Sequence, residues 1–178
     1  MALLAISAIG ADRPGIVAAV SRVLLDHGCN LEDTSMSRLH GEFVMMLVVE
    51  GPASADALSA ALEPVAAELD LLVGVREIDS STATATAAPA RPHIVSVYGA
   101  DHPGILHGFA DLLARRGVNI TDVTTRLLDP HGTPVYLMVL EVDLPTGSDP
   151  EALAAELDTL GAELGVEASM HAAEPDIL

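Results

Sequence analysis

The most constraining feature of this chain is a phrase that occurs twice, 89 residues apart. Gly10-Ala-Asp-Arg-Pro-Gly-Ile16 returns as Gly99-Ala-Asp-His-Pro-Gly-Ile105. In both copies a Gly-x-Asn motif follows at the same offset, beginning at Gly28 and at Gly117. The chain is therefore internally duplicated, and its two halves are expected to share one fold.

The alignment of the two copies shifts further along the chain. Beyond the Gly-x-Asn motif the offset becomes 91, because Gly41 and Glu50 then match Gly132 and Glu141. We expect the two extra residues of the second copy to lie in a hairpin turn, where insertions cost little free energy.

The duplication divides the chain into two modules, each of roughly 80 residues, which is small for a domain. We predict a first module over 1–80, a linker over 81–92 and a second module over 93–173. The linker prediction rests on a Ser/Thr/Ala/Pro tract without apolar periodicity. Half of the residues are hydrophobic but only 2% are aromatic, so we expect thin aliphatic cores, with dimerisation helping to cover apolar sheet faces.

Hydrophobic periodicity predicts the same six elements in each module, in the order β-α-β-β-α-β. This order implies an α+β, ferredoxin-like fold with an antiparallel sheet and both helices on one face. Pro14 is expected in the first turn of the first helix, and Pro64 is expected to bend or break the second. The strands are expected over 3–9, 30–39, 43–50 and 71–78, then 93–98, 120–128, 135–142 and 166–170; the helices over about 14–27 and 54–69, then 103–116 and 150–163.

Charge and composition exclude several classes of protein. The formal net charge is −18, divided into −8 over residues 1–80 and −10 over residues 81–178. The eight basic residues are scattered arginines, so no stripe exists to neutralise a row of phosphates, and direct nucleic-acid binding is not expected. No apolar run is long enough for a membrane span, and we expect the apolar N-terminus to form a strand and not a signal peptide. With Cys29 as its single cysteine, the chain has no internal disulfide, and we expect a cytoplasmic protein.

The repeated phrase lies where a strand ends and a helix begins. Backbone N–H groups at a helix N-terminus lack intrahelical partners and carry a positive partial charge, so they can hold a ligand carboxylate. Gly15 would let the ligand approach the amides closely, Ile16 would contribute its own, and Asp12 beside them could bind an ammonium group. The loop therefore predicts recognition of a zwitterion.

Plainer interpretations stay open for the same residues. Asp12 and Asp101 also suit helix N-caps, and Asn30 and Asn119 suit turns that satisfy local backbone groups. Arg13 is replaced by His102 in the second copy, which favours a solvated residue at the helix start.

The sequence offers no support for catalysis or for a cofactor. His102 and His107 are five residues apart, unlike the i, i+4 pair of a helical metal site, so no metal site is expected. Cys29, whose counterpart is Val118, is expected to be a packed side chain. No nucleophile-base group, phosphate-binding glycine loop or acid/base carboxylate pair is recognisable, and we expect no enzyme activity.

The motifs Gly-Ala-Asp-Arg-Pro-Gly-Ile-Val at 10–17 and Gly-Cys-Asn-Leu-Glu-Asp at 28–33 resemble those of the ACT domain family, small βαββαβ modules that sense amino acids. The likeness covers about residues 4–172 as two modules in tandem, and is strongest to stand-alone regulators of the glycine cleavage repressor type. This resemblance implies side-by-side module pairing with an amino acid, glycine or serine being favoured, at the interface. The binding positions it implies are Asp12, Gly15, Ile16, Asn30 and Leu31, and Asp101, Gly104, Ile105, Asn119 and Ile120.

The resemblance also implies that the chain acts through a protein partner, a transcriptional activator, as a dimer and without contacting DNA. The alternative is a detached sensor subunit that regulates an amino-acid or folate enzyme in trans. The identity of the co-purifying partner distinguishes the two.

Overall fold

The computed structural model describes residues 1–79, 91–128 and 135–173. The chain divides into two compact units, Met1–Thr86 and Ala87–Leu178, called the first and second module below. Most of the expected linker, and residues 174–178, lie outside the described residues. Arg91 and Pro92, expected in the linker, already belong to the first strand of the second module.

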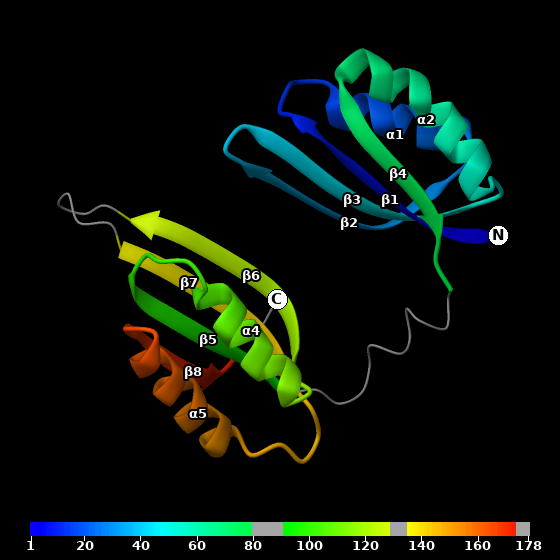
Figure 1. Cartoon of the computed structure of the whole chain (residues 1–178). Helices are drawn as coiled ribbons and strands as arrows, with labels where there is room; N and C mark the ends of the chain where they lie inside the picture. The colour runs from blue at the N-terminus through cyan, green and yellow to red at the C-terminus, as the bar shows by residue number, and fades with distance from the viewer. Residues whose placement is uncertain (80–90, 129–134, 174–178) are drawn as a thin grey trace. The chain divides into compact units, whose positions relative to one another are not determined.

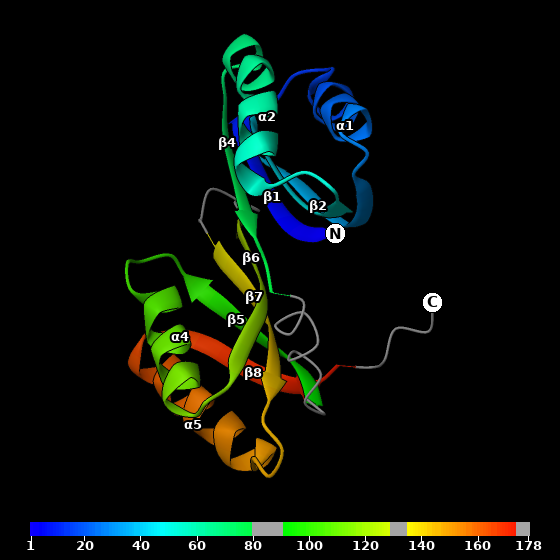
Figure 2. The ribbon, with the colours of Figure 1, turned by 90° about the vertical axis from the view of Figure 1, so that its right-hand side faces the viewer.

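Each module has the expected βαββαβ order and one four-stranded antiparallel sheet. The strand orders are β2-β3-β1-β4 and β6-β7-β5-β8, so the ferredoxin-like prediction is confirmed. Figure 1 and the rotated view in Figure 2 show both helices of each module on one face of its sheet. The first module contains β1 (Ala2–Ala11), α1 (Ile16–Asp26), β2 (Asn30–Leu39), β3 (Glu42–Gly51), α2 (Ala55–Leu69) and β4 (Leu71–Glu77); the second contains β5 (Arg91–Ala100), α4 (Ile105–Arg115), β6 (Asn119–Leu128), β7 (Val135–Leu144), α5 (Pro150–Glu163) and β8 (Val166–Ala172).

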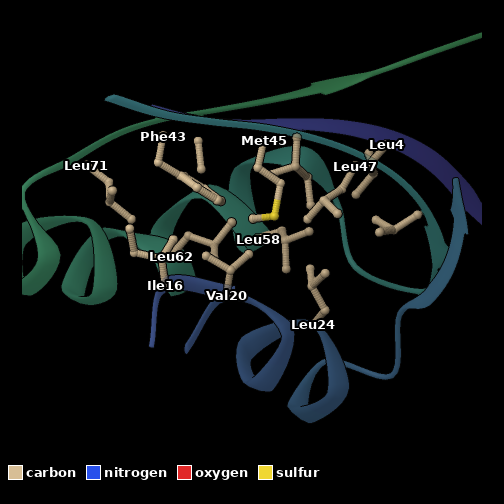
Figure 3. Close-up of a cluster of buried hydrophobic side chains, with 13 residues drawn as sticks. Leu4, Ile16, Val20, Leu24, Phe43, Met45, Leu47, Leu58, Leu62 and Leu71 are labelled. Carbon is tan, nitrogen blue, oxygen red and sulfur yellow. The ribbon is translucent and has the colours of Figure 1, made fainter. Parts of the chain in front are cut away.

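Each module has its own hydrophobic core between the sheet and its two helices. In β1 the core side chains alternate, as the two-residue period of a strand requires, while those of α1 recur every four residues. Burying one such aliphatic side chain stabilises the fold by about 1.5–3 kcal/mol. Figure 3 shows the side chains that meet in the first core, among them Val20 and Leu24 of α1, Leu58 and Leu62 of α2, and Phe43 and Met45 of β3.

Helix α1 begins later than expected. Its N-cap is Gly15, and the first intrahelical hydrogen bond runs from the Ala19 N–H to the Gly15 carbonyl, at 2.9 Å. Pro14 therefore precedes the helix, and the prediction that it occupies the first turn was wrong. The positive φ of Gly15, 102°, explains the difference, because a left-handed residue cannot lie inside a right-handed helix.

The insertion in the second module is larger than expected. Strand β1 pairs Ala2 with Gly51, while the equivalent position of β5, Arg91, pairs with Leu144. The register therefore gives an offset of 93 for β3 and β7, and the alignment of Glu50 with Glu141 was wrong. Two residues join β2 to β3, whereas residues 129–134, which lie outside the described part, join β6 to β7.

Pro64 does not break the second helix of the first module. Helix α2 is assigned as one helix from Ala55 to Leu69 with Pro64 inside it. The turn after α2 is made by Asp70, which adopts a left-handed conformation with φ 54°.

Candidate functional site

The loops between β1 and α1 and between β5 and α4 have nearly the same backbone shape. Gly15 has φ 102° and ψ −15°, and Gly104 has φ 101° and ψ −11°. No other atom lies within 4 Å of where a Cβ would stand on either glycine. Glycine is thus favoured here by backbone conformation, and the space beside it is open to an approaching molecule.

The helices that follow these loops, α1 and α4, are not capped by side chains of the described residues, unlike α2 and α5. Ser54 caps α2 by accepting from the Ala57 N–H at 3.2 Å, and Asp149 caps α5 by accepting from the Glu151 and Ala152 N–H groups at 3.0 and 3.2 Å. By contrast, no side chain caps α1 or α4, and neither first turn contains an acidic residue. The amides that begin α1 and α4 are therefore available to an anion from outside the helix.

Asp12 and Asp101 are not helix N-caps, because glycine holds that position in both loops. The Asp12 N–H donates to the Gly41 carbonyl at 2.8 Å, which ties the loop to the turn after β2. Its carboxylate accepts a hydrogen bond from Arg38 of β2 at 3.1 Å, in an exposed ion pair. The capping interpretation was therefore wrong: each aspartate lies three residues before the glycine at the N-cap position of its helix.

The predicted asparagines lie far from these loops within their own modules. Asn30 and Leu3 both pair with Glu50, at one end of the sheet, whereas Gly10 pairs near the other end. At about 3.3 Å per residue, the seven residues from Leu3 to Gly10 place Asn30 roughly 23 Å from the loop that contains Asp12. Asn119 has the equivalent position in the second module.

The predicted residues therefore form two separate groups in each module. One contains Asp12, Gly15 and Ile16 at the helix start; the Ile16 side chain is buried, so only its backbone faces the loop. The other contains Asn30 and Leu31 at the far end of the edge strand. The second module repeats this with Asp101, Gly104 and the buried Ile105 in one group, and Asn119 and Ile120 in the other.

The side-chain amide of Asn30 contacts a carboxylate and not the turn backbone that the plainer interpretation expected. The Asn30 side-chain amide donates to the Glu32 carboxylate at 2.8 Å and is exposed. Both edge strands carry a bulge just after the asparagine, between Leu31 and Asp33 and between Ile120 and Asp122. Asp33 accepts from the Thr34 N–H at 2.7 Å, which gives the recurring aspartate a local structural role at the bulge.

His102 ties the second loop to the end of α5. Its Nε2 lies 2.6 Å from the Leu164 carbonyl oxygen, and its Nδ1 lies 3.1 Å from that of Pro103. Carbonyls only accept hydrogen bonds, so both contacts are satisfied only by the doubly protonated ring. These two bonds, with Asp101 nearby, raise the pKa of His102 above its ordinary value.

An apolar hollow of about 240 Å³ lies between α1 and strands β2 and β3. Val17 and Leu25 line it from the helix, and Leu31 and Met36 line it from the edge strand. All four side chains are between 45% and 67% exposed. Every residue of β2 is exposed, so this helix and this strand present one open apolar surface beside an unpaired sheet edge.

Three further observations concern other classes of site. Among the described residues, no three His, Cys, Asp or Glu side chains gather as they would around a metal ion. Cys29 packs against Gly51, and burial raises the pKa of its thiol, which favours the unreactive protonated form. Within the same residues, no helix is long and apolar enough to cross a membrane.

The sequence did not reveal Arg38 as the partner of Asp12. Residues were singled out because they recur, and the counterpart of Arg38 is Leu127. Tyr136 was missed for the same reason, since its counterpart is Phe43. A search for residues that differ between the two copies would have found both.

Comparison with known proteins matches a family model described as the ACT domain to residues 2–76 and again to residues 91–171. The glycine cleavage system transcriptional repressor of Escherichia coli is 29% identical over 175 residues, which cover 94% of this chain and 88% of that protein. A UPF0237 protein of Methanopyrus kandleri is 40% identical over 77 residues, covering 42% of this chain and 86% of its own.

Two solved structures match the chain over both modules. A protein of unknown function from Galdieria sulphuraria has a TM-score of 0.81 at 26% identity, over 97% of this chain and 99% of its own. A candidate glycine cleavage system transcriptional repressor has a TM-score of 0.72 at 21% identity, over 97% and 98% of the two chains, and supports the fold alone.

Proposed function

Because the chain belongs to the ACT domain family, which is matched in both halves, we propose that it is a regulatory protein that senses a small amino acid. The observation that carries this proposal is the repeated loop, in which an uncapped helix start stands beside an aspartate in both modules. The amino acid binds at module interfaces, and its binding changes the affinity of the chain for a protein partner.

The chemistry of the loop fits a zwitterion. The ligand carboxylate accepts hydrogen bonds from the first amides of α1 or α4, where the helix dipole favours an anion. The ligand ammonium is held by the carboxylate of Asp12 or Asp101. Gly15 and Gly104 leave room for the ligand backbone, because no side chain stands at either position.

An interface completes the site because one module cannot bring the predicted residues together. Asn30 lies roughly 23 Å from the loop of its own module, so it can contact a ligand only at the loop of another module. A second edge strand could pair antiparallel with the open edge of β2 or β6. The start of each edge strand would then lie beside the helix-start loop of the opposite module. The apolar hollow beside β2 would be covered by the same association.

Glycine and serine are the favoured ligands. The choice of glycine rests on the name of the Escherichia coli relative, a glycine cleavage system transcriptional repressor that matches 94% of this chain and 88% of that protein. Serine, and a transcriptional activator as the partner of a cytoplasmic dimer, are carried over from the family resemblance. The acidic balance of both modules is consistent with action through a protein and without direct DNA contact.

The second candidate function is control of an amino-acid or folate enzyme in trans by the same ligand-binding modules. Affinity purification of the tagged chain with and without glycine would separate the two. A transcription factor whose recovery depends on glycine supports the first function, whereas a metabolic enzyme with that dependence supports the second.

Calorimetric titration with the twenty amino acids tests the site itself. We expect binding of glycine or serine and at least a tenfold loss of affinity in the double variant Asp12→Ala/Asp101→Ala. Asn30→Ala/Asn119→Ala should weaken binding in the same direction. The matched control is Asp26→Ala/Asp111→Ala, which removes an exposed aspartate from each first helix, away from the loop. If every variant bound as tightly as the parent chain, the site assignment would be wrong.

A further inference from the structure

The two loops have the same backbone conformation but differ in the charged side chains around their aspartates. In the first module Arg38 donates to the Asp12 carboxylate at 3.1 Å. Arg38 pairs with Phe43 in the sheet, and the equivalent pair in the second module is Leu127 with Tyr136. A cation is thus present beside one aspartate and replaced by an aliphatic side chain beside the other.

Asp101 makes no ion pair among the described residues. Arg126 precedes Leu127, but successive strand residues point to opposite faces of the sheet, so it does not take the place of Arg38. His102, the neighbouring residue, directs both ring nitrogens at carbonyl oxygens.

A second difference follows from the same pair of strands. Tyr136 is the counterpart of Phe43 and adds a hydroxyl to the ring, which donates to the Met138 sulfur at 3.7 Å. Asp101 lies near enough to raise the pKa of Tyr136, although burial contributes more to that shift. Within the part of the chain that the structure describes, the Asp101 carboxylate thus has no arginine partner, while the Asp12 carboxylate has one.

We propose that the two modules bind the amino acid with different affinities, and that Arg38 is the residue that lowers the affinity of the first module. This inference rests on the proposed function. A ligand ammonium approaching Asp12 meets a carboxylate already paired with Arg38, whereas at Asp101 no arginine among the described residues pairs with the carboxylate. Exposed ion pairs are weak, so the competition reduces affinity only about fivefold.

The test reads each site separately. The backbone amides of Gly15 and Gly104 adjoin the two helix starts, so their NMR signals report ligand binding at each module during one titration with glycine or serine. In the parent chain we expect the Gly104 signal to reach half-saturation at about fivefold lower ligand concentration than the Gly15 signal.

Reciprocal variants assign the difference to Arg38. Arg38→Leu should bring the Gly15 midpoint within twofold of the Gly104 midpoint, and Leu127→Arg should weaken binding at Gly104 alone. The matched control is Arg22→Leu, which removes an equally exposed arginine and its ion pair with Asp26, 3.1 Å long, from the same module. The control should leave both midpoints unchanged.

The outcomes separate the two ideas. If both signals shift with equal midpoints, or if Arg38→Leu leaves the Gly15 midpoint where it was, the inference fails while the proposed function stands. If no amino acid shifts either signal, the proposed function fails, and the inference fails with it.

Discussion

At the scale of single residues, the repeated phrase contains two glycines that are required for different reasons. A Cβ on Gly10 would lie 2.7 Å from the Asp70 carbonyl oxygen, so this glycine permits the close approach of β1 and β4. Gly15 meets no neighbour but has a φ of 102°. One position is therefore restricted by packing and the other by backbone conformation.

The conformational requirement at Gly15 can be measured directly. Gly15→Ala should lower the free energy of unfolding by about 1–3 kcal/mol, because alanine is strained at a positive φ. Gly15→Asn should cost less, since asparagine tolerates left-handed conformations better. Urea unfolding of both variants checks this expectation, and equal losses would point to a clash in place of backbone strain.

His102 should make the second module sensitive to pH. Because its pKa is raised in the fold, its contribution to stability is complete below the ordinary histidine pKa of about 6.5 and is lost as pH rises through the higher folded value. The unfolding midpoint of the parent chain should therefore fall across this range relative to that of His102→Gln. His107→Gln, which removes an exposed histidine from α4, the helix that follows the loop, is the control and should retain the pH dependence of the parent chain.

At the scale of elements, the four helices of the described residues fall into two kinds by how they begin. Helices α2 and α5 are capped by Ser54 and Asp149, whereas α1 and α4 begin at uncapped glycines. Within each module the helix beside the repeated loop is the one left uncapped. This contrast within one chain is the strongest structural indication that the loops have a function beyond folding.

The two aspartates at the starts of α4 and α5 should respond differently to substitution. Asp149→Ala should destabilise the second module by about 0.5–2 kcal/mol, because it removes a cap from α5. Asp101→Ala removes no cap and should change stability by less than about 0.5 kcal/mol while weakening ligand binding. Chemical unfolding and titration of both variants test this contrast, and a comparable loss of stability in Asp101→Ala would contradict it.

The order of elements could be predicted from the sequence because strand and helix periodicities are strong and occur twice. Details decided by geometry could not. Proline is common at the start of helices, yet the positive φ of Gly15 moves the start of α1 beyond Pro14. Matching Gly41 with Gly132 and Glu50 with Glu141 raised the offset from 89 to 91. The strand register raises it to 93, so the alignment missed two residues of the insertion.

The same limit applies to the candidate site. Asp12 and Gly15 could be found because they recur, and the structure places them together beside the helix start. Their separation from Asn30 could not be predicted from the motif, since it depends on the direction in which α1 returns along the sheet. Arg38 was invisible to an argument from recurrence because its counterpart is a leucine.

At the scale of the whole molecule, the chain has two independent hydrophobic cores. Phe109 is fully buried in the second core and Leu58 in the first, and no residue belongs to both clusters. A destabilising substitution in one core should therefore lower the stability mainly of the module that contains it.

A pair of core substitutions tests this independence. Phe109→Ala should destabilise the second module by about 3–5 kcal/mol, and Leu58→Ala should destabilise the first by about 2–5 kcal/mol. Amide hydrogen exchange followed along the chain should show lost protection only in the module that carries the change. Equal loss in both modules would mean that they unfold as one cooperative unit.

The open sheet edges also govern how copies of this protein meet in solution. Strands β2 and β6 end their sheets and offer backbone N–H and C=O groups, which can pair with another edge whatever its side chains. The net charge of −18 opposes such encounters by mutual repulsion, whose reach is about 10 Å at 0.1 M ionic strength and about 3 Å at 1 M. Salt concentration should therefore control the association of copies through these edges. In dilute buffer charge repulsion opposes pairing of the edges, and in concentrated salt this repulsion is screened and pairing is favoured.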